Sequence, residues 1–333
     1  MWAVVIEEYG SPEVLQLKEI PNLEPERLEV RVKVYASALN RADIEQRKGN
    51  YPPPIASQYE IPGLEFAGVV DKLGGEVSKW QLGDRVFGLL VAGGYAEQVL
   101  VNERMLMPIP ANLCFEQAAA IPEVFFTAYD ALIDKANFQA GNTVLIHAGA
   151  SGVGTAAIQL ARVMGASTIF TTSRSTEKLE KCLDLGANRA INTAQEEFDR
   201  VVLDATASRG VDIILDFVGA AYLEKNLNAA ALEGRIVQIA MLSGASAEIN
   251  LQKILSKRLR LQGTTLRSRP IEQKMALTQK FTQQILPLFA DGRLKPLIDR
   301  SFELQEIVEA HRYMENNSNF GKIVLTVTSK EEL

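Results

Sequence analysis

The second half of the chain alternates strand-like and helix-like segments, and this alternation restricts the fold more than any other feature. Six segments have strand character: Thr143–Ala148, Ser167–Thr172, Arg189–Asn192, Val211–Phe217, Arg235–Ala240 and Arg260–Thr265. Segments of helical character lie between most of them, namely Gly152–Met164, Thr176–Leu185 and Ala221–Leu232. Six strands joined by helices predict a parallel, doubly wound sheet of the Rossmann α/β class.

The first 120 residues follow a different pattern, of short strands separated by turns. Glu29–Val34 alternates charged residues with valine, which is the period of a half-buried strand, and Phe66–Val70 and Asp84–Gly88 are similar. We expect a small β-rich domain whose loops carry polar residues. The chain ends with two helix-like runs and a strand, at Glu272–Phe289, Leu304–Asn316 and Ile323–Val327. We expect the last two of these segments to return to the first domain.

Composition argues against several classes of function. The chain has 35 Lys and Arg against 41 Asp and Glu, a formal net charge of −6, which disfavours nucleic-acid binding. Two cysteines (Cys114, Cys182) and two histidines (His147, His311) are too few for a disulfide framework or a four-thiolate zinc site. We expect both cysteines to serve as small apolar residues, His147 to lie in the core, and His311 to lie on the surface of the last helix.

No targeting or membrane segment is visible. The apolar start Met1–Ile6 is followed by Glu7 and Glu8 and has no basic flank. No apolar run approaches the ~18 residues that a membrane-spanning helix needs. We therefore expect a cytoplasmic protein without a membrane partner.

The strongest chemical signal is the turn that follows the first strand of the second half. Gly149, Ser151 and Gly154 form a G-x-G-x-x-G pattern in which Ser replaces the middle glycine. Small residues let backbone N–H groups approach a pyrophosphate, and the N-terminus of the following helix adds partial positive charge. The strand before the turn and the helix after it predict a dinucleotide-binding site.

The end of the second strand indicates which dinucleotide is preferred. NAD sites usually place Asp or Glu there to bind the ribose 2′-hydroxyl. This chain has no acid at that point, whereas Ser173, Arg174 and Lys178 could surround a 2′-phosphate. We therefore expect NADPH rather than NADH.

With these motifs in place, the whole chain resembles the medium-chain dehydrogenase/reductase superfamily, and within it the zinc-free NADPH:quinone oxidoreductases. The matching segments are Ser37–Asp43, Tyr51–Pro53, Gly63–Gly68, Gly83–Val86, Gly94–Glu97, Ala118–Pro122 and Gly321–Leu325. Ile146–Gly149 and Thr282–Pro287 most resemble the tumour-suppressor-inducible branch. The resemblance implies a GroES-like catalytic domain (residues 1–120 and 268–333) together with a Rossmann cofactor-binding domain (residues 121–267).

The resemblance also separates this chain from the zinc alcohol dehydrogenases. Those enzymes hold a catalytic zinc with Cys, His and Cys, and the matching positions here are Asn40, Leu64 and Glu123. An amide, an aliphatic side chain and one carboxylate cannot make that site, so we expect no bound metal. Reduction of a quinone by a nicotinamide needs no Lewis acid. The prediction is a zinc-independent NADPH:quinone oxidoreductase with a small-molecule quinone as substrate.

By resemblance, Asn40, Asp43 and Tyr51 line the active-site cleft. Tyr51 would hydrogen-bond the substrate carbonyl or donate a proton, and Asn40 would polarise or orient it. Structural roles remain open, since Tyr51 could pack a loop and Asp43 could cap the helix that follows it. The implied cofactor-binding residues are Thr127, Ala150, Ser151, Gly152, Val153, Gly154, Ser173, Arg174, Lys178, Asn192, Val218, Gly219, Ala240, Met241, Leu242, Leu266 and Lys322.

Three further expectations accompany this prediction. Related enzymes often have Tyr after the third strand, where this chain has Asn192-Thr193, so Arg174 or Lys178 would carry more of the NADPH preference. The alternatives to a quinone reductase are an enoyl or alkenal reductase acting on activated C=C bonds, and a non-catalytic NADPH-binding protein. The resemblance also implies a homodimer formed through edge strands of the cofactor sheet near Arg235–Ala240.

Overall fold

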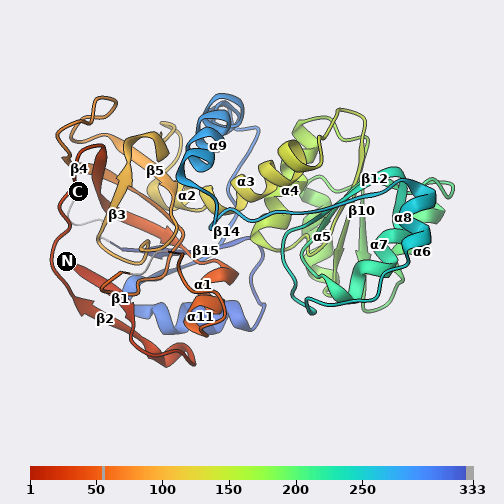
Figure 1. The fold of residues 1–333 in the computed structure, drawn as a ribbon, viewed down its shortest axis with the longest axis horizontal. Coiled ribbons are helices and arrows are strands. Elements are labelled where there is room, and N and C mark those ends of the chain that lie inside the picture. Colours follow the sequence, from red (N-terminus) through yellow and green to blue (C-terminus); the bar gives the residue numbers. More distant parts are fainter. Residues whose placement is uncertain (55–56, 328–333) are drawn as a thin grey trace. The chain divides into compact units, whose positions relative to one another are not determined.

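The computed structural model describes residues 1–54 and 57–327, and the chain folds as two units (Figure 1). Unit 1 combines Met1–Phe126 with Leu266–Leu333, and unit 2 is Thr127–Thr265. The boundary after Phe126 falls inside helix α3 (Pro122–Tyr129). No helix among the described residues combines the length and apolar character that a membrane span requires.

Unit 2 is built on a six-stranded sheet in which every pair of neighbours is parallel. The strand order is β10-β9-β8-β11-β12-β13, the 3-2-1-4-5-6 order of a Rossmann sheet, so the predicted fold class is confirmed. The strands are β8 (Thr143–Ile146), β9 (Thr168–Ser173), β10 (Arg189–Asn192), β11 (Val211–Asp216), β12 (Ala230–Gln238) and β13 (Arg260–Gly263).

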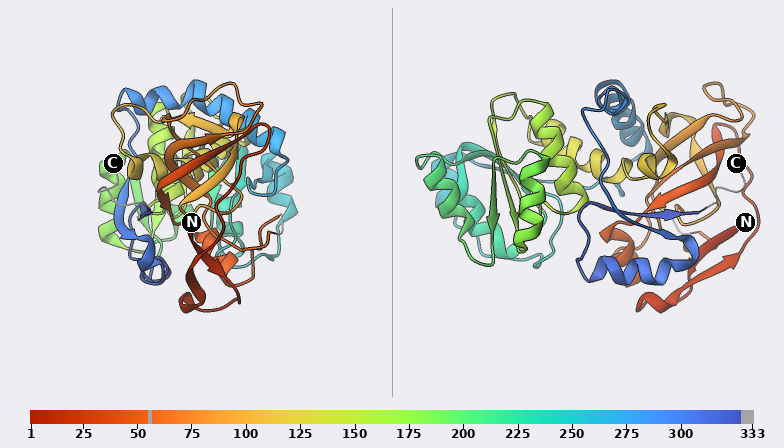
Figure 2. Two further views of the ribbon diagram at one scale, coloured as in Figure 1. Left: turned by 90° about the vertical axis from the view of Figure 1, so that its left-hand side faces the viewer. Right: turned by 180° about the vertical axis from the view of Figure 1, so that it is seen from behind.

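Helices flank this sheet (Figure 2) and bury its apolar strands. They are the π-helix η3 (Asp130–Lys135), α4 (Gly152–Val163), α5 (Thr176–Leu185), α6 (Phe198–Ala205), the short η4 (Ala220–Tyr222), α7 (Leu223–Ala229) and α8 (Leu251–Lys257). Phe170, Phe198, Ile214 and Leu227 meet in the core of this unit.

Two predictions about β12 are wrong. Helix α7 ends at Ala229, and the helix-like segment that we extended to Leu232 becomes strand from Ala230. The Lys257 ammonium donates to the carbonyl oxygens of Leu227, Asn228 and Ala230, at 2.9, 2.7 and 2.8 Å. A side chain distant in sequence thus satisfies the free carbonyls that end the helix. Strand β12 is also interior, so Arg235–Ala240 lies at no sheet edge; the edge strands are β10 and β13.

Unit 1 contains a sheet of order β14-β15-β3-β4-β5-β7, with β6 also paired to β3, and a separate hairpin of β1 and β2. The strands are β1 (Trp2–Ile6), β2 (Leu15–Glu19), β3 (Glu29–Ala38), β4 (Glu65–Leu73), β5 (Arg85–Leu89), β6 (Gln98–Asn102), β7 (Leu106–Pro108), β14 (Ile298–Glu303) and β15 (Lys322–Thr326). Because β15 pairs with β3, the C-terminal segment returns to the N-terminal domain as predicted.

The helices of unit 1 are α1 (Arg41–Arg47), α2 (Phe115–Ala119), α9 (Ile271–Gln284), α10 (Leu286–Ala290) and α11 (Ile307–Glu315), with the short turns η1 (Pro12–Val14), η2 (Glu103–Met105) and η5 (Leu304–Glu306). The single helix-like run predicted over Glu272–Phe289 is divided at Ile285. Pro287 accounts for the break, because it has no N–H to donate and restricts the residue before it.

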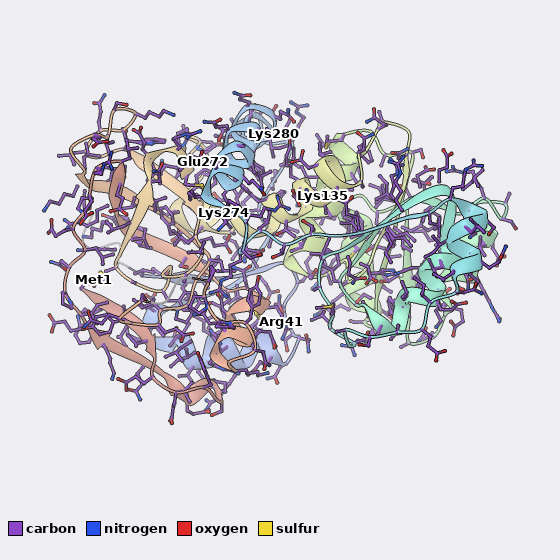
Figure 3. All side chains as sticks on the ribbon, in the orientation of Figure 1. Met1, Arg41, Lys135, Glu272, Lys274 and Lys280 are labelled. Atoms are coloured by element: carbon purple, nitrogen blue, oxygen red, sulfur yellow. The ribbon has the colours of Figure 1, made fainter. Side chains whose placement is uncertain are left out.

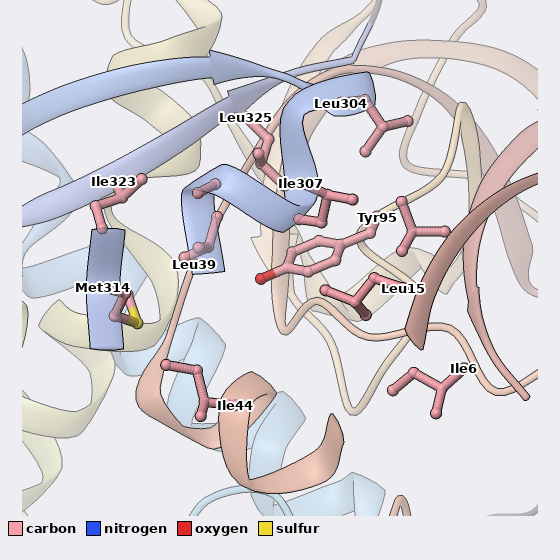
Figure 4. Packing of buried hydrophobic residues seen from close by; sticks show 12 residues of the cluster. Ile6, Leu15, Leu39, Ile44, Tyr95, Leu304, Ile307, Met314, Ile323 and Leu325 are labelled. Atoms are coloured by element: carbon pink, nitrogen blue, oxygen red, sulfur yellow. The ribbon is translucent and has the colours of Figure 1, made fainter. Parts of the chain in front are cut away.

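Helices α1 and α11 are joined by Arg41, labelled in Figure 3, which donates to the carbonyl oxygen of Met314 at 3.2 Å. The apolar cluster around them is shown in Figure 4 and includes Ile44, Tyr95, Ile307 and Ile323.

Two predictions about single residues in unit 1 are wrong. His311 is fully buried, because α11 turns Ile307, Ala310, His311 and Met314 toward the core. Cys114 is exposed, at the start of α2, whereas Cys182 is buried as predicted.

Candidate functional site

The turn between β8 and α4 in unit 2 has the geometry of an anion site. Ser151 caps α4, its Oγ accepting the Gly154 N–H at 3.0 Å. Among the described residues, the backbone N–H groups of Ala150, Gly152 and Val153 have no hydrogen-bond acceptor. Three unpaired donors at the start of a twelve-residue helix suit a pyrophosphate.

Two glycines of this turn, Gly149 and Gly154, are required by close contacts. A Cβ on Gly154 would lie 2.4 Å from the carbonyl oxygen of Ala148, and one on Gly149 would lie 1.9 Å from Oγ1 of Thr171. Neither position can hold a larger residue without movement of the backbone or of β9. Gly149 and Gly154 are therefore in close contact with neighbouring atoms, while the N–H groups of Ala150, Gly152 and Val153 have no acceptor among the described residues.

The residues predicted to contact a 2′-phosphate follow β9. Arg174 is exposed, and Ser173 and Lys178 are half-buried. Asn192, at the end of β10, is used within the protein: its Nδ2 donates to Oγ1 of Thr176 at 3.1 Å, and its Oδ1 accepts the Ala194 N–H at 3.0 Å. Asn192 thus braces the neighbouring turns with its amide, while Arg174 extends into solvent.

A second turn of unit 2, at the end of β11, is held by a buried carboxylate. Oδ1 of Asp216 accepts the N–H groups of Val218 at 2.6 Å and Gly219 at 3.0 Å. Gly219 has a φ of +87°, and a Cβ there would lie 2.9 Å from the carbonyl oxygen of Gly244. The conformation of this predicted cofactor-binding turn therefore depends on Asp216.

The same carboxylate begins a buried polar chain. Asn226 Nδ2 donates to Oδ2 of Asp216 at 2.9 Å. This orients Asn226 Oδ1 toward Nε2 of His147 at 2.7 Å, so Oδ1 accepts a hydrogen bond from the His147 Nε2–H. His147 Nδ1 then accepts from the Thr172 hydroxyl at 3.0 Å. Burial lowers the pKa of His147, which keeps the imidazole neutral in this tautomer. His147 is the core histidine that the sequence predicts.

The remaining predicted cofactor residues differ in exposure. Met241 and Leu242, in the loop after β12, are exposed, and Ala240 before them is half-buried. Thr127 on α3 and Leu266, the first residue of the second segment of unit 1, are both buried.

Unit 1 holds a buried ion pair with an amide between its partners. The Lys322 ammonium donates to Oε1 of Glu65 at 2.6 Å, to Oδ1 of Asn40 at 2.7 Å and to the carbonyl oxygen of Leu39 at 2.7 Å. Asn40 Nδ2 donates to the same Glu65 oxygen at 2.8 Å, and the other Glu65 oxygen accepts the Glu123 N–H at 2.8 Å. Every donor of Lys322 is therefore used within unit 1.

This arrangement does not fit a catalytic zinc. An ammonium group already lies among the oxygen atoms of Asn40 and Glu65, and Leu64 is a buried aliphatic side chain. Residues 1–54 and 57–327 contain no group of three or more His, Cys, Asp or Glu side chains that could hold a metal ion. The donor set expected for zinc is thus replaced by a protein cation and its partners.

Asp43 is fully buried at the start of α1. Its Oδ2 accepts the Asn40 N–H at 2.8 Å and the Tyr95 hydroxyl at 2.8 Å, and its Oδ1 accepts the Gly63 N–H at 3.2 Å. Burial raises the pKa of Asp43 to about 6, against the opposing effect of these donors. The carboxylate caps α1 and fixes Asn40 and Tyr95.

Of the three predicted catalytic residues, Tyr51 is the one with an unused polar side-chain atom among the described residues. Among the described residues its hydroxyl has no hydrogen-bond partner, although its backbone N–H donates to the Glu45 carbonyl at 3.2 Å. The Arg267 guanidinium lies over its ring, 4.9 Å from the centroid, and donates to its carbonyl oxygen at 2.8 Å. The phenol is therefore held by its ring and backbone while the hydroxyl stays available.

The structure thus joins Asn40, Asp43 and Lys322 through direct contacts, and the roles of these three and of Tyr51 in catalysis or cofactor binding stay predictions. Three residues that organise this region were missed by sequence reasoning: Glu65, Tyr95 and Arg267. Glu65 gave a usable signal, because it is a charged residue at the start of an apolar strand, Glu65–Val70. Arg267 gave none, since its partners lie more than 170 positions away.

Comparison with known proteins gives matches over both units. The family model described as "Alcohol dehydrogenase GroES-like domain" matches residues 26–111, and the model described as "Zinc-binding dehydrogenase" matches residues 152–282. The first match confirms the GroES-like class predicted for the β-rich domain. Human "Quinone oxidoreductase" is 33% identical over 328 residues, which are 98% of this chain and 97% of the human protein.

Solved structures give the same picture. Escherichia coli quinone oxidoreductase complexed with NADPH has a TM-score of 0.89 and 28% identity, covering 98% of this chain and 100% of that chain. JamJ enoyl reductase in its apo form has a TM-score of 0.88 and 30% identity, covering 98% and 99%. The likeness therefore extends to structures described as quinone and as enoyl reductases.

Proposed function

Because the chain belongs to the quinone oxidoreductase family of the medium-chain dehydrogenases/reductases, we propose that it is an NADPH-dependent, zinc-independent quinone reductase. The observation that carries the proposal is the Lys322–Asn40–Glu65 cluster, in which an ammonium group takes the place of a metal cation. Without a Lewis acid to stabilise an alkoxide, alcohol oxidation of the zinc type is disfavoured, whereas a quinone accepts reducing equivalents without one.

Most of the cofactor-binding residues in this proposal belong to unit 2. The unpaired N–H groups of Ala150, Gly152 and Val153 hold the pyrophosphate, and Ser173, Arg174 and Lys178 surround the 2′-phosphate. The family resemblance adds Thr127 and the turns at Val218–Gly219 and Ala240–Leu242, together with Leu266 and Lys322 of unit 1. Lys322 acts there by position, because its ammonium donors are all used within unit 1. Bound NADPH supplies the reducing equivalents from its nicotinamide.

The chemistry of unit 1 centres on Tyr51. Its hydroxyl donates a hydrogen bond to a carbonyl oxygen of the substrate, and it can supply a proton to that oxygen as negative charge develops. Asn40, Asp43 and Lys322 have their polar atoms engaged within the protein. We therefore assign them to positioning the local backbone and to excluding water, rather than to proton transfer.

The test is the oxidation of NADPH in the presence of an ortho-quinone and a para-quinone. We expect turnover with at least one quinone and a large reduction of kcat in Tyr51→Phe with unchanged NADPH affinity. Tight NADPH binding with no turnover on a panel of quinones would overturn the proposal. Arg174→Ala tests the cofactor preference, and we expect it to weaken NADPH binding while leaving NADH binding unchanged.

An enoyl or alkenal reductase is the second candidate. It is favoured by the 30% identity to JamJ enoyl reductase, and a quinone and an enone both present a conjugated carbonyl to Tyr51. Rates on a quinone and on an α,β-unsaturated ketone, measured with the same enzyme and NADPH concentration, separate the two. Absence of turnover on both, with NADPH bound, would instead indicate a non-catalytic NADPH-binding protein.

Two finer proposals accompany the function. Ile146–Gly149 and Thr282–Pro287 support membership of the tumour-suppressor-inducible branch of the family. A homodimer would use the edge strand β13, where Leu261 is exposed, instead of the interior segment Arg235–Ala240. Light scattering of the wild-type protein and of Leu261→Lys tests the dimer, since the charge should produce a monomer.

A further inference from the structure

Arg267 is a buried cation whose guanidinium contacts no carboxylate among the residues that the structure describes. Its Nε donates to the Val91 carbonyl at 2.7 Å, its Nη1 to the Tyr51 carbonyl at 2.8 Å, and its Nη2 to Oε1 of Gln46 at 2.5 Å. Only 6% of the residue is exposed, and this desolvation lowers the pKa of Arg267. Asp43 and Glu60 attract the guanidinium without contacting it and oppose this shift. Burying a charge without a contacting ionic partner is unfavourable, so packing alone does not explain an arginine here.

The backbone of Arg267 is fixed as well. Lys274 on α9, labelled in Figure 3, is buried and donates from Nζ to the Arg267 carbonyl oxygen at 2.7 Å. The ammonium of Lys274 therefore anchors the base of the arginine side chain, although two neighbouring cations repel one another and burial also lowers the pKa of Lys274. Unit 1 thus buries two cationic side chains, Arg267 and Lys274, next to one another.

The three acceptors of Arg267 come from separate elements. Gln46 belongs to α1, Val91 follows β5, and Tyr51 begins the loop that continues into Pro52–Pro54. The planar guanidinium joins these segments and at the same time covers the face of the Tyr51 ring, 4.9 Å from its centroid. A lysine could not do both, because its ammonium has no plane to stack and no fork of donors.

We propose that Arg267 is a positioning residue. It contacts the backbone carbonyl and the ring face of Tyr51, so that the unpartnered Tyr51 hydroxyl points to the carbonyl of the substrate. This inference rests on the proposed role of Tyr51 in reduction. Arg267 contacts Tyr51 at its backbone carbonyl oxygen and at its ring face, and it leaves the phenol hydroxyl, the only polar atom of that side chain, free. Small displacements of a donor from the reacting carbonyl reduce kcat about 10- to 100-fold.

A double-mutant cycle tests the coupling between the two residues. The variants are Arg267→Met, Arg267→Lys, Tyr51→Phe and the Arg267→Met/Tyr51→Phe double variant, assayed for kcat and KM with quinone and for NADPH affinity. Arg300→Met is the matched control, because Arg300 also stacks on aromatic rings, Phe302 and Tyr313, at 5.3 Å each. Its kcat should stay within about twofold of wild type, as expected for a surface substitution.

We expect Arg267→Met to lower kcat about tenfold or more with little change in NADPH affinity, and to have no further effect in the Tyr51→Phe background. An equal loss in both backgrounds, or no loss in either, overturns the proposal. If Arg267→Met does not fold, the cycle uses Arg267→Lys, which keeps the charge and loses the stacked plane.

A second readout does not depend on turnover. In spectra of protein labelled with ¹³C-tyrosine, the Tyr51 signal is identified by its disappearance in Tyr51→Phe. It should shift in Arg267→Lys while the signals of the other tyrosines stay in place, and an unchanged Tyr51 signal also overturns the proposal. A wild-type protein that reduces no quinone but shows this shift would refute the proposed function and leave the positioning role standing.

Discussion

Lys322→Met should destabilise unit 1 more than any substitution of a surface ion pair. Glu65 is fully buried, and only 4% of the Lys322 side chain is exposed. The variant leaves the Glu65 carboxylate with two neutral donors, Asn40 Nδ2 and the Glu123 N–H, and with no positive charge. Removing one partner of a buried pair costs about 3–5 kcal/mol, because the remaining charge stays desolvated. At a urea m-value of about 2 kcal/mol per M, the midpoint of unfolding should fall by about 2 M.

The chain offers a selective probe for this measurement. Both of its tryptophans, Trp2 and Trp80, lie in unit 1, so their fluorescence during urea unfolding reports on that unit. Lys72→Met, which breaks the exposed Lys72–Glu24 pair, is the matched control and should cost less than about 1 kcal/mol. Adding Glu65→Gln to Lys322→Met removes the orphaned charge and should restore part of the loss.

Two results would refute this reasoning. A change below about 1 kcal/mol for Lys322→Met would show that Glu65 is solvated or re-paired in the variant. A Lys322→Met/Glu65→Gln variant no more stable than Lys322→Met would show that lost packing, not the unpaired carboxylate, determines the effect.

Three further substitutions have expected outcomes. Gly154→Ala should abolish detectable NADPH binding while leaving tryptophan-monitored unfolding unchanged, because its Cβ would lie 2.4 Å from the Ala148 oxygen in unit 2; retained affinity contradicts the assigned turn. Burial raises the pKa of Asp43 from 3.8 to about 6, so between these pH values the folded protein keeps a proton that the unfolded chain loses. The unfolding free energy should therefore fall by about 1 kcal/mol per pH unit as pH rises through this range. Asp43→Asn should remove this slope. Burial lowers the pKa of His311 from 6.5 to about 3, so below pH 6.5 the unfolded chain binds a proton that the folded protein does not. The unfolding free energy should therefore fall at a similar rate as pH drops below about 6.5. This slope should be absent in His311→Asn. The two slopes oppose each other, and urea unfolding across pH 4–6 should show wild type nearly flat; equal slopes in wild type and in both variants would contradict the assignments.

The α/β sheet was predictable because local patterns determine it. Strands β8, β9 and β11 are mainly buried runs, each followed by a turn and a helix. Arg189–Asn192 and Thr176–Leu185 were predicted with their observed bounds. The errors occur where distant contacts override local preference. Ala230–Leu232 has helical character, but Lys257 ends α7 before it, and the pairing of β12 with both β11 and β13 extends the strand.

His311 could have been placed correctly from the sequence. Ile307, Ala310, His311 and Met314 have the i, i+3, i+4, i+7 spacing of one helix face, so a buried histidine was the consistent reading. Nε2 of His311 is also a buried side-chain nitrogen with no hydrogen-bond partner among the described residues. Arg47 donates toward Nδ1 at 3.3 Å and so selects the tautomer that leaves Nε2 protonated.

The polar network of unit 1 could not be predicted, because its members are brought together from distant positions. Glu65 and Lys322 are 257 positions apart, and Gln46 and Arg267 are 221 positions apart. No periodicity or spacing rule connects such pairs. A charged residue in a sequence is as consistent with a solvated surface position as with a buried ion pair. Family resemblance implied that Asn40, Asp43 and Lys322 are site residues, yet it did not reveal that their polar side-chain atoms are bonded within unit 1.

That occupancy limits what unit 1 can do to a substrate. Of Asn40, Asp43, Tyr51 and Lys322, only Tyr51 has a polar side-chain atom without a hydrogen-bond partner in the described part of the chain. These residues therefore offer one hydrogen-bond donor to a carbonyl oxygen. A quinone and an enone present that oxygen equally well, and a single shared donor cannot distinguish them. Discrimination between the two substrate classes must then come from other contacts of the substrate. Substitutions of the buried charged network should therefore change kcat for both classes by the same factor, and a change confined to one class would show that the network contacts the substrate directly.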